Sequence, residues 1–338
     1  MRGPHNIFRL IRTGATFERT GAMNVILNAY QAPVGLRLAA KILGWPFQWL
    51  GYKGDPAMPP VTRALTALGP AYIKFGQILS TRPDVVGDEL AVQLRVLQDK
   101  LPPFPIEEAQ KMIEAELERP LASMFQDFSA PVAAASIAQV HRAKLASDGA
   151  DVAVKVLRPG IERAFRRDID AFYFAARMVE VLAPGARRLR PLDVIAHFEG
   201  VVLGELDLRL ESSAAGEFAA NTESDEGFQL PQINWSLSGK NFMTMDWAEG
   251  ISAGDNAALD AAGHDRRRIG ERILQLFLSH ALRDGFFHAD LHQGNIKIAA
   301  NGDVIAYDFG IMGRIDEYTR RVYAEILFGF IRRDYKRV

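Results

Sequence analysis

Apolar residues recur at helical spacing over three long stretches of the chain. Residues 61–117 show this pattern, with a break at Leu101-Pro102-Pro103-Phe104-Pro105, and residues from about 161 to 221 show it again. A third helix is predicted from about Asp265 to Asp284, where Gly285 would end it. The chain is therefore predicted to be largely helical.

Strand-like patterns interrupt these helices. In residues 125–157, Val, Ile and Ala alternate with polar residues around an Asp148-Gly149 turn, and the segment ends in a strand at 152–157. Phe242-Met243-Thr244-Met245 predicts one more strand. The chain thus alternates a helical part, a sheet-rich part, a second helical part, a connecting strand and a third helical part.

The strongest candidate chemistry lies near the C-terminal end. His288-Ala289-Asp290-Leu291-His292-Gln293-Gly294-Asn295 is followed by Asp308-Phe309-Gly310. Two short strands, 295–298 and 304–307, are predicted between these motifs, and Asn301-Gly302 predicts a type I′ turn joining them. An Asp five positions before an Asn is the spacing of a kinase-like catalytic loop, in which Asp290 orients the attacking group and Asn295 binds a metal ion. Asp308 is then the expected main Mg²⁺ ligand, because hard cations prefer carboxylate oxygen.

A sheet-rich part, a connecting strand and a helical part in this order predict an α+β fold, bilobal and protein-kinase-like, with an N-terminal helical extension. The expected segments are residues 1–60 (basic amphipathic helices), 61–120 (a helical extension), 121–246 (the N-lobe) and 247–338 (the C-lobe).

Lys155 is the only charged residue from Val152 to Leu157. This segment is close to the strand motif that places a lysine against nucleotide phosphates. A carboxylate has to hold the lysine, and a predicted helix offers Glu205, Asp207 and Glu211. Asp207 and Glu211 are four apart and share one helix face, whereas Glu205 points elsewhere. The spacing leaves the partner of Lys155 open.

Three features of an ordinary protein kinase are missing. Ala133-Ala134-Ala135-Ser136 stands where a glycine-rich loop would cover the phosphates, and alanine permits fewer backbone conformations than glycine. No long activation segment follows Gly310, since Asp316 is predicted to cap a new helix almost at once. Ala289 replaces the arginine of a His-Arg-Asp loop. A platform for a polypeptide substrate is therefore not expected.

Lys74-Phe75-Gly76-Gln77 is a further motif, inside a predicted helix. Lys74 and Gln77 are three apart and share a helix face, so both side chains could reach one site. A solvated surface lysine is the alternative.

Composition narrows the function classes. The 338 residues carry a formal net charge of −1, which argues against a nucleic-acid binder. The absence of cysteine excludes disulfides, zinc–thiolate sites and cysteine nucleophiles. No apolar run reaches the roughly 18 residues needed to span a bilayer.

The first 55 residues are basic, with aromatic side chains interspersed. Residues 1–33 hold four arginines and one acid, Glu18, and a second basic, apolar stretch runs from Val34 to Leu43. The arginines are Arg2, Arg9, Arg12 and Arg19, and the aromatic residues include Phe8, Phe17, Trp45, Phe47 and Trp49. Such helices suit an anionic membrane surface. Helices docked on the rest of the protein are the alternative.

Apolar residues between Val322 and Ile331 predict a last helix. Neither glycine nor asparagine follows to close it, so we interpret the chain as C-terminally truncated.

Taken together, the motifs resemble one family. The combination consists of Lys74-Phe75-Gly76-Gln77, Ala133-Ala134-Ala135-Ser136, Val152-Ala153-Val154-Lys155, Glu205-Leu206-Asp207 with Glu211, the loop from His288 to Asn295, and Asp308-Phe309-Gly310. In this order, from about Leu68 to Gly313, the chain resembles the UbiB family of atypical kinases, the accessory kinase/ATPases of ubiquinone biosynthesis. Its N-terminal segment is similar to that of proteobacterial members.

The resemblance implies roles for these residues. Lys74 and Gln77 would act at the catalytic centre, with their helix folded across the nucleotide site to exclude protein substrates. Glu211 would pair with Lys155, while Glu205 and Asp207 would meet that helix or the metal ion. The implied nucleotide-binding residues are Ala133, Ala134, Ala135, Ser136, Lys155, Met245 and Trp247.

The implied activity is slow Mg·ATP hydrolysis coupled to the handling of lipophilic quinone precursors. It would take place at the cytoplasmic face of the inner membrane, with other ubiquinone-biosynthesis proteins as partners and a hydrophobic C-terminal membrane segment beyond this chain. One alternative is a small-molecule phosphotransferase of the aminoglycoside or choline kinase type, but those enzymes lack the Lys74 helix and the alanine loop. Another is a nucleotide-gated scaffold of a biosynthetic complex.

Overall fold

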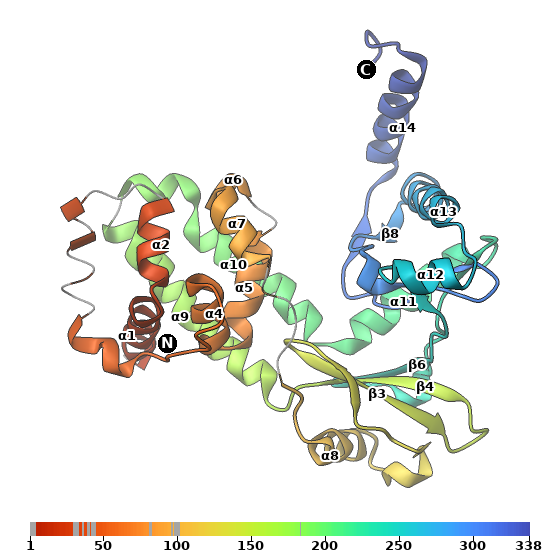
Figure 1. The fold of residues 1–338 in the computed structure, drawn as a ribbon, viewed down its shortest axis with the longest axis horizontal. Coiled ribbons are helices and arrows are strands. Elements are labelled where there is room, and N and C mark those ends of the chain that lie inside the picture. Colours follow the sequence, from red (N-terminus) through yellow and green to blue (C-terminus); the bar gives the residue numbers. More distant parts are fainter. Residues whose placement is uncertain are drawn as a thin grey trace. The chain divides into compact units, whose positions relative to one another are not determined.

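The computed structural model describes residues 5–29, 34–35, 37–38, 41, 45–80, 83–95, 97, 102–182 and 184–338 (Figure 1). Contacts divide the chain into two compact units. The first unit comprises Met1–Pro105, Ala133–Gln139 and Leu157–Leu206, and the second comprises Ile106–Val132, Val140–Val156 and Asp207–Val338. The four segments expected from the sequence stay a prediction.

The first unit is built mainly from helices. They are α1 (His5–Thr20), α2 (Ala22–Ala29), the 3-10 helix η1 (Trp45–Leu50), α4 (Pro60–Leu68), α5 (Pro70–Ser80), α6 (Pro83–Val86), α7 (Asp88–Leu94), α9 (Ile161–Leu182), the 3-10 helix η3 (Pro184–Leu189) and α10 (Pro191–Glu205). Proline is the first residue of α4, α5, α6 and α10. It is favourable there because the N–H of the first helical residue makes no hydrogen bond within the helix, so its absence costs nothing.

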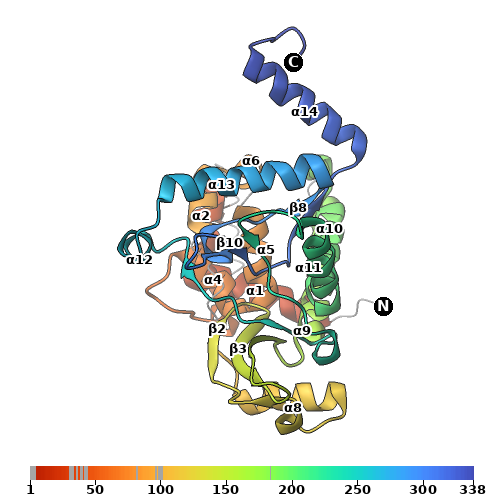
Figure 2. The same ribbon diagram turned by 90° about the vertical axis from the view of Figure 1, so that its right-hand side faces the viewer.

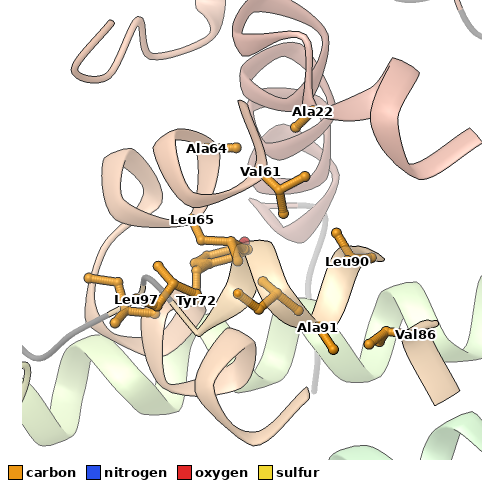
Figure 3. Close-up of a cluster of buried hydrophobic side chains, with 11 residues drawn as sticks. Ala22, Val61, Ala64, Leu65, Tyr72, Val86, Leu90, Ala91 and Leu97 are labelled. Atoms are coloured by element: carbon orange, nitrogen blue, oxygen red, sulfur yellow. The ribbon is translucent and has the colours of Figure 1, made fainter. Parts of the chain in front are cut away.

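Apolar side chains of α2, α4, α5, α6 and α7 form a core in this unit (Figure 3). Its buried members are Ala22, Val61, Ala64, Leu65, Tyr72, Ile73, Val86, Leu90, Ala91, Leu94 and Leu97. The helices approach so closely that a Cβ at Gly76 would lie 2.4 Å from Leu97 Cδ1 and 2.7 Å from Leu65 Cδ1. Packing therefore favours the glycine of the Lys74-Phe75-Gly76-Gln77 motif, because an added Cβ would force the ends of two buried leucine side chains to move.

Helix α1 packs within the first unit against η1, α4 and α9, and the binding of this segment to a membrane surface stays a prediction. Its arginines bind neighbouring segments: Arg9 Nη1 lies 2.8 Å from Asp168 Oδ1 of α9, and Arg19 Nη1 donates to Gly51 O over 2.7 Å. Phe8 and Trp49 stay exposed. Arg2 and half of the second basic stretch lie outside the described residues. None of the described helices is long and apolar enough to cross a membrane.

The strands predicted at 125–157 and 242–245 form one five-stranded sheet. Its order is β1-β3-β4-β6, with β2 paired to β3. The strands are β1 (Phe125–Gln126), β2 (Pro131–Ala134), β3 (Ala138–Leu145), β4 (Asp151–Leu157) and β6 (Phe242–Asp246). In the antiparallel β4–β6 pair, Lys155 lies opposite Met243 and Ala153 lies opposite Met245.

The second unit contains further helices and two small sheets, of order β5-β10-β9-β7 and β11-β8. Its elements are α8 (Ile106–Leu117), the 3-10 helix η2 (Leu121–Ser123), α11 (Leu208–Thr222), β5 (Phe228–Gln229), the 3-10 helix η4 (Trp235–Leu237), β7 (Ile251–Ser252), α12 (Asn256–Ala261), α13 (Arg266–Ser279), the π-helix η5 (His280–Asp284), β8 (Phe286–His288), the 3-10 helix η6 (Gln293–Asn295), β9 (Ile296–Ile298), β10 (Val304–Ala306), β11 (Met312–Arg314) and α14 (Glu317–Arg332). Helix α13 packs against β10 (Figure 2), where Leu276 joins Ile296, Ile298 and Val304 in a core.

The predicted hairpin is confirmed as β9–β10, but its turn is not type I′. That turn needs positive φ at both central residues, and of the two only Gly302 has it, at 89°. Gly302 N donates to Ala299 O over 2.9 Å. This hydrogen bond is typical of a three-residue hairpin loop, in which a type I turn is followed by a left-handed glycine. Asn301 instead uses its side chain, which donates to Asp303 Oδ2 and accepts from Asp303 N.

Two helix predictions need correction. The predicted helix around Glu205 and Glu211 is broken: α10 ends at Glu205, and Asp207 is the N-cap of α11, so Asp207 and Glu211 do not share the face of a continuous helix. Helix α14 begins after the predicted cap, Asp316, but it does not run on to the end of the chain. Arg333 ends it in a left-handed conformation, with φ of 58°.

Substitution of Gly76 tests the packing of α5. We expect Gly76→Ala to destabilise the protein by about 1–3 kcal/mol, because the added methyl group overpacks the core. The matched control is Gly200→Ala in α10, an exposed position with nothing within 4 Å of the added Cβ. There alanine should stabilise by about 0.5–1 kcal/mol through its helix preference. Urea denaturation measures both, and equal effects of the two substitutions would contradict the packing argument.

Candidate functional site

Lys155 of β4 binds two carboxylates inside the second unit. Its Nζ lies 2.6 Å from Glu211 Oε1 of α11 and 3.5 Å from Asp308 Oδ1, which follows β10. The side chains of Lys155 and Glu211 are only 15% and 9% exposed. The structure therefore selects Glu211 from the three acids that the sequence left open, as the resemblance implied.

Lys155, Glu211 and Asp308 shift one another's pKa values. Burial acts to lower the pKa of Lys155, but the charges of Asp308 and Glu211 outweigh it and raise that pKa above its ordinary value. The charge of Lys155 holds the pKa of Asp308 below its ordinary value, although burial opposes this. Burial raises the pKa of Glu211, against the opposing charge of Lys155. The lysine therefore stays charged, and Asp308 stays an anion.

Asp308 keeps an accessible carboxylate. Oδ1 faces Lys155 and also accepts the N–H of Gly310 over 3.1 Å. The side chain is 43% exposed, far more than Glu211. Next to it, Phe309 is buried against Phe218 of α11, with ring centroids 6.3 Å apart. The buried phenylalanine anchors the Asp308-Phe309-Gly310 turn and leaves the aspartate at the surface of the site.

His288 connects the two motifs and was not singled out by the sequence reasoning. Its Nδ1 accepts the N–H of Asp290 over 3.1 Å, so Nε2 carries the proton and donates it to the carbonyl of Asp308. Burial lowers the pKa of His288, which favours this neutral form. The sequence signal was its position two residues before Asp290.

Asn295 is oriented by the catalytic loop itself. Its Nδ2 donates to the carbonyl of Asp290 over 3.1 Å, which turns its Oδ1 away from that carbonyl. The Asn295 side chain is buried, whereas that of Asp290 is 46% exposed. His292 Nε2 lies 3.8 Å from Asp290 Oδ2. An exposed carboxylate beside a fixed amide oxygen suits a base next to a metal ligand.

This donor set fits Mg²⁺ bound together with phosphates. The ion prefers oxygen, keeps several waters, and is usually held by one or two protein groups plus substrate phosphates. Asp308 and Asn295 offer one carboxylate and one amide oxygen. Within the described part of the chain no three His, Asp or Glu side chains form a cluster that could hold a metal ion alone.

In the first unit, Lys74 and Glu205 form a second buried ion pair. Lys74 Nζ lies 2.7 Å from Glu205 Oε1, and the side chains are 15% and 10% exposed. Gln77 donates from Nε2 to the carbonyl of Leu97 over 3.0 Å. Lys74 is therefore not a solvated surface lysine, which was the alternative that the spacing left open, and its role in chemistry stays a prediction.

Asp207 is the N-cap residue of α11. Its side chain accepts from the N–H of Arg209 and binds the guanidinium of Arg209 at 2.6 and 2.8 Å. Its expected role as a metal ligand stays a prediction.

The alanine loop forms a tight turn without any left-handed residue. Ala135 N donates to Ala138 O over 2.8 Å, and Ser136 is buried. None of Ala133, Ala134, Ala135 and Ser136 has positive φ, so the loop has no conformational need for glycine. Arg158 donates to Ala135 O at 3.1 and 2.9 Å, a contact that the sequence did not reveal.

Met245 and Trp247 lie in and just after β6. Met245 is buried and pairs with Ala153, two residues before Lys155. Trp247 N donates to Asp151 O over 3.1 Å, which extends the strand pairing past the end of β6. Both predicted nucleotide-binding residues therefore belong to the strand beside the lysine strand.

Comparisons with known proteins show the family to which the chain belongs. Residues 96–338 match the ABC1 atypical kinase-like domain. The whole chain is 39% identical to a protein of Shewanella baltica called probable protein kinase UbiB, of which it covers 60%. It is also 41% identical, over 81% of its length, to a protein of that name from Marinobacter nauticus, of which it covers 51%. The chain thus spans about half to three fifths of the length of these relatives.

A solved structure supports the fold. The complex of Rv3197 with erythromycin, from Mycobacterium tuberculosis, superimposes with a TM-score of 0.54 at 29% identity, over 73% of this chain and 61% of that one. The match to the domain, the identity to the UbiB relatives and the kinase-like fold confirm the resemblance read from the motifs, and the chain belongs to the ABC1 atypical kinase-like family.

Proposed function

We propose that the protein is an atypical kinase-like ATPase that uses Mg·ATP in support of ubiquinone biosynthesis. The observation that carries this proposal is the Lys155–Glu211–Asp308 cluster, joined by His288 to the Asp290 and Asn295 loop. The UbiB names of the relatives support the biosynthetic context. Its substrates would be lipophilic quinone precursors.

We assign a different role in phosphoryl transfer to each residue of the site. Lys155 presents a fixed positive charge to the nucleotide phosphates, and Glu211 keeps its side chain extended toward them. Asp308 and Asn295 would hold Mg²⁺, which offsets negative charge on the phosphates when bound. Asp290 accepts the proton of an attacking water or hydroxyl group as the new P–O bond forms and the bond to ADP breaks.

The first unit would contribute through Lys74, Gln77 and the alanine loop. A lysine on an additional helix can compete for phosphate, so Lys74 would restrain the chemistry. The exclusion of polypeptide substrates fits the short connection from Gly310 to α14. Exposed Phe8 and Trp49 are side chains suited to an anionic membrane surface, and we propose the cytoplasmic face of the inner membrane as the location.

Two other functions make different predictions. A small-molecule phosphotransferase would give a phosphorylated acceptor in stoichiometric amount with ADP. A nucleotide-gated scaffold would bind ATP with negligible turnover. ATP turnover measured with and without a phenolic quinone precursor, with analysis of the products, separates these from a precursor-stimulated ATPase. A turnover rate that the precursor leaves unchanged would contradict the proposed coupling.

Asp308→Asn should abolish Mg²⁺-dependent ATP binding, because a neutral amide replaces the anionic ligand of a hard divalent ion. Asp290→Asn should leave binding largely intact and lower turnover by about 10²–10⁴-fold, the usual contribution of a general base. Calorimetric binding and steady-state ATPase assays distinguish the two. Wild-type affinity for Mg·ATP in Asp308→Asn would show that the metal site is assigned wrongly.

Glu211→Gln should raise the Mg²⁺ concentration needed for ATP binding by about tenfold or more. Without the Glu211 charge, Lys155 is left with Asp308 as its ionic partner, and a lysine held there competes with the metal ion. Titration of Mg²⁺ at constant ATP measures this shift.

Glu217→Gln is the control on the same helix. Glu217 binds Arg314 at the surface of the second unit, at 2.7 Å, and takes no part in the Lys155 cluster. Its substitution should leave the titration unchanged. An identical Mg²⁺ requirement in Glu211→Gln and wild type would contradict the role given to the ion pair.

A further inference from the structure

Glu116, in the last turn of α8, binds a loop that the chemistry described above does not use. This loop, residues 239–242, precedes β6 and donates to both carboxylate oxygens of Glu116. Lys240 N donates to Oε1 over 2.5 Å, and Asn241 donates from N and Nδ2 to Oε2 over 3.1 and 3.0 Å. A helix dipole disfavours a negative charge at the C-terminal end. These donors offset that effect and hold the carboxylate in place.

The backbone of the 239–242 loop lies directly against the Glu116 carboxylate. Gly239 N donates to Phe242 O over 2.8 Å, which closes the loop on itself. A Cβ at Gly239 would lie 2.3 Å from Glu116 Oε1 and 2.7 Å from its Cδ. Even one methyl group at position 239 would therefore push the carboxylate away from its donors.

Lys240 connects Glu116 to the start of α11 through its two backbone groups. Its N–H binds Glu116, and its carbonyl accepts the N–H of Leu208 over 2.9 Å. Leu208 is the first residue of α11 and is buried. Glu211 follows three residues later, about 4.5 Å along the helix axis. A single residue therefore links the Glu116 carboxylate to the helix that carries the partner of Lys155.

The same loop leads directly into the strand beside Lys155. Phe242 is the first residue of β6 and lies opposite Val156, and Met243 lies opposite Lys155. The loop thus touches the start of α11 and the start of β6, and β6 is paired with the strand that carries Lys155. Because the ion pair of Lys155 and Glu211 forms between these elements, the position of the loop affects the geometry of the pair.

We propose that Glu116 is a positioning residue that holds Glu211 on Lys155 and thereby sets the affinity of the site for Mg·ATP. Release of the 239–242 loop lets the start of α11 shift, and the 2.6 Å contact between Lys155 and Glu211 lengthens. Lys155 then binds Asp308 more closely and competes with the metal ion there. This proposal rests on the proposed function, because it requires Mg·ATP as the ligand. The alternative is that Glu116 only stabilises the fold.

The first test is Glu116→Gln, with Mg²⁺ titrated at constant ATP and ATP binding as the readout. Glutamine keeps the size of the side chain, but it has one acceptor oxygen, and its NH₂ group would face the two donors of Asn241. We expect the Mg²⁺ concentration needed for ATP binding to rise by about threefold to tenfold, which corresponds to the loss of about one hydrogen bond. Gly239→Ala should raise it in the same way, because it displaces the carboxylate and keeps its charge.

Glu114→Gln is the matched control. Glu114 belongs to the same helix, and its Oε1 also accepts a backbone N–H, that of Leu121 over 2.8 Å, but it does not contact the 239–242 loop. Its substitution should leave the Mg²⁺ requirement unchanged, whatever it does to the urea midpoint of unfolding. An equal rise of the requirement in Glu114→Gln and Glu116→Gln would overturn the proposal, because both would then act through the stability of α8.

A double variant separates positioning from a purely structural role. If Glu116 acts through Glu211, adding Glu116→Gln to Glu211→Gln should raise the Mg²⁺ requirement no further. The same rise with and without Glu211 would overturn the proposal, and so would a wild-type requirement in both Glu116→Gln and Gly239→Ala. If folded wild-type protein does not bind Mg·ATP, the proposed function itself fails. If it binds Mg·ATP and only the Glu116 and Gly239 variants have no effect, that function stands.

Discussion

The burial of one positive charge, that of Lys155, constrains the whole arrangement of the second unit. An ammonium group removed from water without a partner costs several kcal/mol, so the fold has to bring carboxylates to it. Glu211 arrives on α11 and Asp308 at the end of β10, from positions 56 and 153 residues along the chain. A strand, a helix and a loop are thereby tied together at the Nζ atom. The same atom is the one that we propose to meet phosphate, so stability and proposed chemistry depend on one contact.

The two catalytic motifs are joined through backbone groups, and this leaves their carboxylates available. His288 accepts from the N–H of Asp290 and donates to the carbonyl of Asp308, using one ring nitrogen for each. A side chain that bound the carboxylates themselves would fix the same loops, but it would compete with a metal ion and with the attacking group. Because His288 is buried and neutral, it adds no charge to the site. The histidine is therefore a positioning residue that holds the aspartates without engaging them.

Residue spacing predicted the local part of the site, whereas the long-range pairing of Lys155 with Glu211 was implied only by the family resemblance. The spacing of Asp290, Asn295 and Asp308 fixes their relation because few residues separate them, and the apolar alternation located the hairpin between them. Which acid pairs with Lys155 could not be predicted from spacing, because it depends on where the helical segment is interrupted. That break follows from Asp207 capping α11, which a helical pattern running through the segment concealed. The turn type was predicted wrongly because a local hydrogen bond was again not visible in the pattern. The Asn301 side chain binds Asp303, and Asn301 does not adopt the positive φ of a type I′ turn.

The break between α10 and α11 also gives two nearby acids opposite electrostatic surroundings. Glu205 is the last residue of α10, where the helix dipole disfavours a negative charge, whereas Glu211 lies in the first turn of α11, where the dipole favours one. Each acid binds a buried lysine. The helix dipole does not stabilise the negative charge of Glu205, so that charge depends on its lysine, Lys74, more strongly than the charge of Glu211 depends on Lys155. Lys74 thus contributes to the electrostatics of the first unit, independently of any effect on a nucleotide. An activity change in a Lys74 variant can be assigned to chemistry only when the stability of that unit is measured beside it.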